Sequence, residues 1–250
     1  MLTVISPAKT LNFESETSSK QTSQASFLED SQRLVDLMKK KGPKDYVTKT
    51  DKRVEKILIE ELEKSKKNYS FITEETGIIK KSDTDNFWII DPIDGTTNFL
   101  HGIPHFAISV ALKNKNEIII GLIFDPIKNE MFFAEKDKGS FLNNQRIRVS
   151  KRGNLEDCLV ATSGKINKDY NFNYRKTGCA ALDLAYVACG RFDGYFQNNL
   201  NLWDIAAGIV IVKEAGGVIN DIDIFNQKIN KIIVSSNDIS LKFREKIVNF

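Results

Sequence analysis

The chain contains 250 residues, of which 41% are hydrophobic and 28% are charged, and its formal net charge at pH 7 is +3. This composition is typical of a soluble globular protein with one large domain or two small ones. So small a positive charge argues against direct nucleic-acid binding, and no apolar run is long enough to predict a membrane-spanning helix.

The cysteines indicate the compartment. Cys158, Cys179 and Cys189 form no C-x-x-C pair, and three thiols cannot all pair with one another. They suit a reducing compartment, where disulfides are rare. The N-terminus also lacks the apolar run of a signal peptide. We therefore expect a cytoplasmic protein.

Residues 1–38 are expected to form an atypical N-terminal segment, separate from a main domain of residues 39–250. Within this segment, residues 16–26 are rich in Ser, Thr and Gln, which is typical of a loop or of disorder. Apolar residues then recur at helical spacing, which predicts a helix over residues 27–40.

An amphipathic helix is predicted next, over residues 52–64, where apolar residues share one face. Asp51 stands before it and could serve only as its N-cap. A short apolar strand begins at Phe71 and ends in two acids, Glu74 and Glu75. Two acids here are typical of an exposed loop, and they gain significance only if further acids lie beside them.

Residues 88–99, with the sequence Trp-Ile-Ile-Asp-Pro-Ile-Asp-Gly-Thr-Thr-Asn-Phe, form the most informative stretch. They begin as an apolar, β-branched run, which predicts a buried strand. Because proline cannot donate to a sheet ladder, the strand is expected to end or turn at Asp91-Pro92. Asp94 follows in the same turn, and Gly95 precedes a predicted helix.

This arrangement of acids and a helix start has a chemical meaning. Carboxylates at a strand end can hold a hard cation through oxygen, and the free N–H groups of a helix start can bind an anion. Asp94 alone could be a simple helix cap. Two carboxylates crowded at the end of an apolar strand repel each other unless they are compensated, which favours metal-assisted phosphate chemistry.

The remainder of the chain alternates strands and helices. Apolar runs at residues 106–112, 118–124 and 131–134 are separated by turn signals. They predict an antiparallel meander with helices on its outer face. A helix of small residues is predicted over residues 177–190, and another begins at Trp203.

Two motifs carry a family resemblance: residues 88–99, and Leu-Trp-Asp-Ile-Ala-Ala-Gly at 202–208 followed by Glu-Ala-Gly-Gly at 214–217. From residue 40 onward the chain resembles the inositol monophosphatase family of Mg²⁺-dependent, lithium-sensitive phosphatases. The resemblance implies the α+β class, a layered αβαβα sandwich, a small sugar or inositol phosphate as substrate, and a homodimer. Residues 1–38 instead resemble the start of the YaaA-type peroxide-stress protein family, which suggests a fusion.

The resemblance also assigns roles to individual residues. The Mg²⁺ ligands that it implies are Glu74, Asp91, the Ile93 carbonyl, Asp94 and Asp204. Because no His or Cys is among them, Mg²⁺ or Mn²⁺ fits better than zinc. The catalytic residues that it implies are Glu74 together with Asp51 and Thr96, of which the last two orient the attacking water. The phosphate or substrate contacts that it implies are Asp94, Gly95, Thr96, Gly178, Ala180 and Gln197.

The resemblance leaves the substrate and the role of the chain open. The family usually has an acid where this chain has Gln197, and an amide accepts hydrogen bonds from sugar hydroxyls less strongly than a carboxylate. Inositol 1-phosphate is the leading substrate. The alternatives are histidinol phosphate, fructose 1,6-bisphosphate and 3′-phosphoadenosine 5′-phosphate. A further alternative is a non-catalytic relative that binds a partner in transcription.

Overall fold

The computed structural model describes residues 47–164, 170 and 172–247. The chain divides into two units, Met1–Lys41 and Gly42–Phe250, and all described residues belong to the second. The atypical segment and the helix predicted over residues 27–40 therefore lie outside the described residues.

An eight-stranded sheet forms the first half of the described unit, in the order β2-β1-β3-β4-β5-β6-β7-β8. Its strands β1 and β3 are parallel and all its other neighbours are antiparallel. The predicted meander is confirmed as β4 to β6. The strands are β1 (Ser70–Thr73), β2 (Gly77–Ile79), β3 (Asn86–Asp94), β4 (Ala107–Asn114), β5 (Glu117–Asp125), β6 (Glu130–Glu135), β7 (Gly139–Leu142) and β8 (Gln145–Arg146).

A five-stranded sheet forms the second half, in the order β10-β9-β11-β13-β12. Here β9 is parallel to both β10 and β11, whereas β13 is antiparallel to β11 and β12. The strands are β9 (Leu159–Ala161), β10 (Asn173–Arg175), β11 (Gly194–Asn201), β12 (Val218–Ile219) and β13 (Lys228–Ser235).

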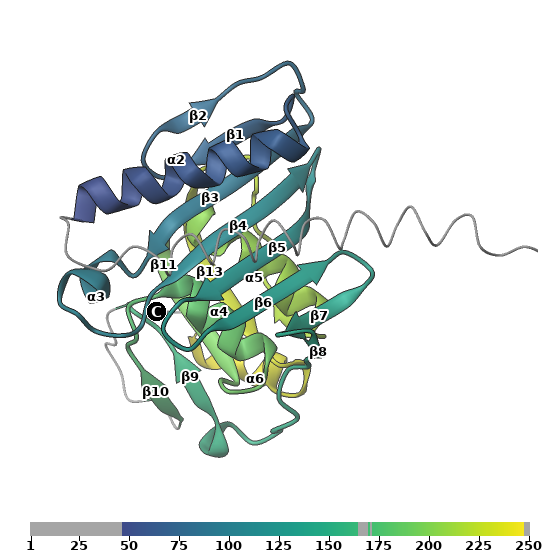
Figure 1. The fold of residues 1–250 in the computed structure, drawn as a ribbon. Coiled ribbons are helices and arrows are strands. Elements are labelled where there is room, and N and C mark those ends of the chain that lie inside the picture. The colour runs from purple at the N-terminus through teal and green to yellow at the C-terminus, as the bar shows by residue number, and fades with distance from the viewer. Residues whose placement is uncertain (1–46, 165–169, 171, 248–250) are drawn as a thin grey trace, which may run out of the picture. The chain divides into compact units, whose positions relative to one another are not determined.

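Helices complete the layers. In Figure 1, α2 covers the outer face of the first sheet, and α4 and α5 lie between the two sheets. On the far face of the second sheet, Phe243 and Ile247 of α6 pack with Val160, Phe196 and Ile233. The layered αβαβα sandwich that the family resemblance implies is thereby confirmed. The helices are α2 (Val47–Ser65), α3 (Thr96–Leu100), α4 (Ala180–Ala188), α5 (Leu202–Glu214) and α6 (Ser240–Ile247), with short 3₁₀ turns η1 (Leu155–Asp157) and η2 (Asn237–Ile239).

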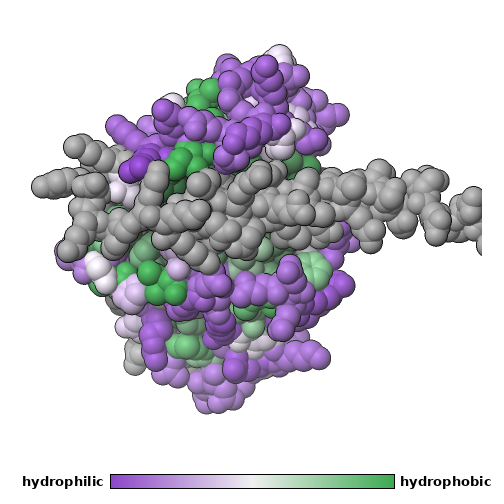
Figure 2. Space-filling view, viewed as in Figure 1, coloured by the Kyte–Doolittle hydropathy of each residue, from purple (hydrophilic) through white to green (hydrophobic). Residues whose placement is uncertain are grey.

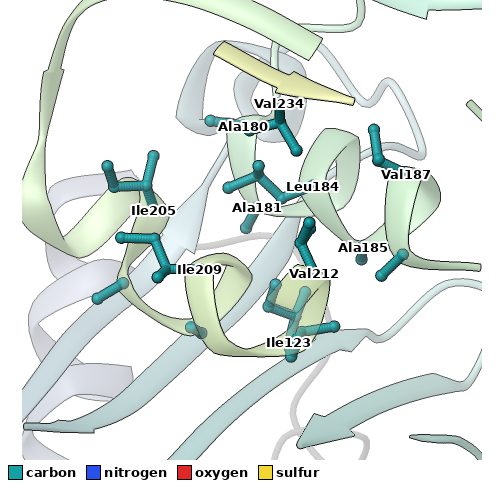
Figure 3. Close-up of a cluster of buried hydrophobic side chains, with 14 of the residues drawn as sticks. Ile123, Ala180, Ala181, Leu184, Ala185, Val187, Ile205, Ile209, Val212 and Val234 are labelled. Carbon is teal, nitrogen blue, oxygen red and sulfur yellow. The ribbon is translucent and has the colours of Figure 1, made fainter. Parts of the chain in front are cut away.

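The core between the sheets is built from small residues on α4 and branched residues on α5 (Figure 3). Strand alternation directs Ile89 and Ile123 of the first sheet into this layer, and Val234 enters it from the second. Gly208 of α5 lies so close to Leu184 of α4 that an added Cβ would overlap that side chain. The small residues thus let the two helices approach closely and hold their N-termini at the same end of the layer.

Strand β3 differs from the sequence prediction at one point. The strand was expected to end or turn at Asp91-Pro92, but it continues through Pro92 to Asp94. Its register with β4 shifts between Asp91 and Asp94, so the proline occupies an irregularity of the ladder. Proline is tolerated at such positions because the ladder there does not need its N–H. The irregularity ends the strand with both aspartates close together.

The face of the molecule seen in Figure 2 is mostly hydrophilic where described residues form it, and hydrophobic residues lie there in small separate patches. Among the residues that the structure describes, no helix is both long and apolar enough to cross a membrane.

Candidate metal and phosphate site

Two parallel strands bring the first acids together. Because β1 and β3 run in the same direction, their carboxyl ends meet at one edge of the sheet. Glu74 directly follows β1, and its backbone N–H donates to the Ile90 carbonyl of β3 at 3.2 Å. Asp91 is the next residue of β3 and is buried, with 2% of its surface exposed. Burial raises the pKa of Asp91, and the charge of the neighbouring Glu74 adds to the shift.

The turn after Asp91 is held by its own side chains. The Asp91 carboxylate accepts the Ile93 N–H at 3.0 Å, and the Thr96 hydroxyl donates to the Ile93 carbonyl at 3.1 Å. Gly95 sits before α3 with φ of +90°, a left-handed conformation that favours glycine. A Cβ there would lie 3.1 Å from the His105 carbonyl, so the turn is also tightly enclosed.

Asp94 reaches from this turn to the start of α4. Its carboxylate accepts the Ala181 N–H at 2.5 Å and the Cys179 thiol at 3.1 Å. Acids are favoured at a helix N-terminus, where backbone N–H groups have no partner within the helix. The contact brings Gly178 and Ala180, which flank Cys179, next to the turn of β3.

Asp204 comes from the first turn of α5. Its carboxylate accepts the backbone N–H of Asn201, the N-cap residue, at 2.7 Å. The neighbouring Trp203 carbonyl accepts the Ser109 hydroxyl of β4 at 3.4 Å, which ties the start of α5 to the first sheet. Asp204 lies close enough to Asp94, Asp91 and Glu74 to raise the pKa of each.

Burial raises the pKa of all four acids, and crowding raises it further for three of them. Burial is the largest cause in each case, and the negative charges of the other acids add to it for Glu74, Asp91 and Asp94. The pKa of Asp94 rises to about 7, even though its bonds to Ala181 and Cys179 lower it. When these four acids are ionised, they place a surplus of negative charge in the site, and a bound cation would neutralise it.

The donor set fits a hard divalent cation. Every candidate ligand is an oxygen, from four carboxylates and the Ile93 carbonyl, which is the set that Mg²⁺ prefers. Among the residues that the structure describes, no group of three or more His, Cys, Asp or Glu side chains is arranged so that it could hold a metal ion without rearrangement.

Asp51 lies beside this group on α2. It is buried, with 4% of its surface exposed, and its Oδ1 has no hydrogen-bond partner among the described residues. Burial raises its pKa to about 7, and the charges of Glu75 and Glu74 contribute. No hydrogen bond joins it to Thr96 within the described ranges. A buried carboxylate oxygen that lacks a partner can accept a proton or a hydrogen bond from a bound molecule.

Glu55 was not predicted from the sequence. This residue of α2 is 1% exposed, and its carboxylate accepts the Glu75 N–H at 2.9 Å and the Thr76 hydroxyl at 2.5 Å. It therefore fixes the turn that carries Glu74. The pattern of α2 gave no signal, since a glutamate in a charged helix predicts an exposed side chain.

Asn98 was also missed. From α3, its amide nitrogen donates to the carbonyls of His105 and Thr177, each at 2.8 Å. Gly178 follows Thr177 with φ of +81°, and a Cβ there would lie 3.2 Å from the same amide nitrogen. Asn98 thus joins the helix next to Gly95 to the segment that leads into α4. Its only signal was its place in the motif at residues 88–99.

Gln197 lies on β11, two residues after Tyr195. The Tyr195 hydroxyl donates to the Gln197 Oε1 at 2.7 Å. Tyr195 is fully buried, and the charges of Asp183, Asp94 and Asp204 are among the causes that raise its pKa. The tyrosine therefore connects Gln197 to the acidic group.

Comparison with known proteins agrees with this arrangement. The model of the inositol monophosphatase family matches residues 9–238. An inositol-1-monophosphatase of Rhizobium meliloti is 45% identical over 192 residues, which cover 71% of this chain and 72% of that protein. The Nus factor SuhB of Haemophilus influenzae is 43% identical over 201 residues, or 74% of this chain and 75% of that protein.

Solved structures give the same result. The extragenic suppressor protein suhB of Bartonella henselae superposes with a TM-score of 0.74 at 41% identity, and the match covers 84% of this chain and 87% of that one. The fold and the acidic site define a layered α+β protein whose carboxylates gather at the edge between two sheets. The chain belongs to the inositol monophosphatase family.

Proposed function

We propose that the chain hydrolyses phosphate monoesters with Mg²⁺ as its cofactor, and that inositol 1-phosphate is the leading substrate. The observation that carries this proposal is the convergence of Glu74, Asp91, Asp94 and Asp204, which the structure brings together from β1, β3 and α5. Family membership and relatives named inositol-1-monophosphatase support it.

The residues have distinct tasks in this proposal. Asp91 with Glu74 and the Ile93 carbonyl would hold one cation, and Asp94 with Asp204 a second. When bound, such cations activate water and stabilise the leaving oxygen. The free N–H groups of Gly95 and Thr96 would bind phosphate oxygens.

Water attack requires a group that orients the water and takes its proton. The Thr96 hydroxyl proton already points to the Ile93 carbonyl, so its oxygen is left to accept a hydrogen bond from water. Asp51 Oδ1 is buried without a partner and would accept the proton that the water loses. Water then attacks phosphorus directly, and no phosphorylated enzyme forms.

A substrate panel tests this proposal. Phosphate release should be measured from inositol 1-phosphate, histidinol phosphate, fructose 1,6-bisphosphate and 3′-phosphoadenosine 5′-phosphate, with Mg²⁺ and with a chelator. Release that a chelator abolishes is the expected result, and the fastest substrate identifies the specificity. A folded sample that releases no phosphate at any Mg²⁺ concentration would contradict the proposal.

A second candidate is a role in transcription through a bound partner, because several relatives are Nus factors named SuhB, at 41% to 43% identity. Asp91→Asn separates the two candidates. The substitution should abolish hydrolysis, whereas a role that depends on partner binding should survive it.

A further inference from the structure

The contact between Tyr195 and Gln197 determines which atoms of the glutamine face outward. Tyr195 is fully buried, and in the described part of the chain its hydroxyl has one hydrogen-bond partner, Gln197 Oε1 at 2.7 Å. Gln197 is only half-buried. Its amide nitrogen makes no hydrogen bond to any described residue and is not enclosed.

The orientation of the amide follows from hydrogen-bond satisfaction. A flipped amide would donate to the Tyr195 oxygen, and the buried phenolic proton would then have no acceptor. An unsatisfied buried donor is unfavourable. The phenol also stays protonated, because burial and the neighbouring acids raise its pKa far above the usual range. The Gln197 carbonyl is therefore occupied and its two N–H donors are available.

These donors lie at the margin of the acidic site. Strand β11 runs on from Gln197 to Asn201, whose N–H donates to the Asp204 carboxylate, and the charges of Asp94 and Asp204 are among the causes that raise the pKa of Tyr195. Gln197 is one hydrogen bond further out. Residues two apart on a strand share a face, so both side chains point from β11 toward the layer of α4 and α5.

We propose that Gln197 makes this chain a phosphatase for phosphate monoesters that carry a carboxylate close to the phosphate, alongside neutral polyol phosphates. The inference rests on the proposed phosphatase function. An amide nitrogen donates to a carboxylate oxygen in a charge-assisted hydrogen bond, and it also donates to a hydroxyl. A neutral amide adds no negative charge to a site already rich in acids. It therefore does not repel an anionic substituent of the substrate.

The Gln197→Glu variant reverses this chemistry with little change in shape. One carboxylate oxygen would still accept the Tyr195 hydroxyl, and the other would face the substrate as a charged acceptor. It would bind hydroxyls well and repel a carboxylate. The variant should therefore shift the preference from carboxylated substrates toward polyol substrates.

Two probes differ only in this group. In 2-phosphoglycerate a carboxylate is attached to the carbon that bears the phosphate, and in glycerol 2-phosphate a hydroxymethyl group takes its place. For the native chain we expect kcat/KM values on the two within about tenfold of each other. In Gln197→Glu we expect the ratio of kcat/KM on 2-phosphoglycerate to kcat/KM on glycerol 2-phosphate to fall at least about tenfold. A change in the ratio of less than about threefold would overturn the inference.

Controls separate this result from other failures. Gln145→Glu makes the same chemical change at an exposed position of β8 and should leave the ratio unchanged. Tyr195→Phe frees the Gln197 carbonyl to turn outward and should lower the ratio even if Gln197→Glu fails to fold. If the folded native chain releases phosphate neither from these two probes nor from the substrate panel, the proposed function fails. Binding of 2-phosphoglycerate in the presence of Ca²⁺, measured by calorimetry, then decides the inference. The inference is contradicted if the native chain and Gln197→Glu bind 2-phosphoglycerate with equal affinity.

Discussion

The two ends of the acidic site are positioned by different means. At the start of α5, Asp204 accepts the N–H of Asn201, three residues before it in the chain. At the end of β3, Asp94 accepts the N–H of Ala181, which is 87 residues away. The first acid is held by its own helix, and the second is held only when α4 has packed against the turn of β3.

The difference shows which parts of the site depend on tertiary structure. A backbone donor within one helix turn places Asp204 as soon as α5 forms. Asp94 depends on Asn98 and on the packing of α4, and Glu74 depends on Glu55 of α2. Substitutions at these distant supports should therefore reduce function more than a substitution beside Asp204.

The largest effect is expected at the end of β3 itself. Asp91→Asn removes the buried carboxylate that lies among three other acids, and hydrolysis should fall by at least about a thousandfold. Phosphate release at saturating Mg²⁺ measures this. As a matched control, Asp193→Asn changes a buried carboxylate that binds Arg152 and the Leu159 N–H instead, and it should lower stability yet keep hydrolysis.

Loss of the support under Glu74 should have the next largest effect. Glu55→Ala frees the turn at Glu75 and Thr76, and the Mg²⁺ concentration for half-maximal activity should rise about tenfold to a hundredfold, as with other supports of metal ligands. Glu55→Gln keeps an acceptor and should have a smaller effect. Glu63→Ala, on the same helix but in a partly exposed pair with Lys81, should change nothing. Equal effects of the Glu55 and Glu63 substitutions would show that the turn does not need this support.

Asn98→Ala tests the junction between α3 and the segment before α4. The carbonyls of His105 and Thr177 lose their donor, so the start of α4 should shift relative to the turn at Gly95, which is proposed to bind phosphate. We expect KM to rise about tenfold with a smaller change in kcat. Asn143→Ala is the matched control, because Asn143 also bridges two segments but in the turn after β7. A fall in kcat alone would contradict this role.

The comparison also explains how much the sequence predicts. The strands β4 to β6 follow from apolar runs and turn signals, whereas the layered fold follows only from the family resemblance. The acids at 91 and 94 are visible because they are neighbours in the chain. The contacts of Glu55 and Asn98 span 20 and 79 residues, and no local pattern reports such distances. Pro92 was expected to end or turn the strand, but β3 continues to Asp94 because a register shift next to it removes the need for its N–H.

Cation binding should stabilise the fold more at high pH than at low pH. Burial and crowding raise the pKa values of Asp51 and Asp94 from 3.8 to about 7. Because the folded values lie above the unfolded ones, these groups contribute stability below about pH 4, and the contribution is lost as the pH rises through about 7. Bound Mg²⁺ would neutralise the carboxylates that become charged at high pH. We expect Tm to rise about 5 °C with excess Mg²⁺ near pH 8, and less near pH 5.

The control for this measurement is NaCl at equal ionic strength, which screens charge without binding at the acids. Asp91→Asn should reduce the gain near pH 8. A gain of equal size at both pH values would show that the cation does not act through these carboxylates.

The smallest effect is expected beside Asp204. Asn201→Ala removes the N-cap side chain of α5, which also accepts the Lys228 ammonium at 2.6 Å, and should cost about 1 kcal/mol of stability, or about 3 °C in Tm. The backbone N–H of residue 201 remains, so Asp204 keeps its donor at 2.7 Å and hydrolysis should stay within about twofold of the native rate. Thermal unfolding and kcat/KM, measured on the same sample, check both parts. A loss of activity as large as that of Asn98→Ala would mean that Asp204, like Asp94, depends on side chains outside its own helix turn.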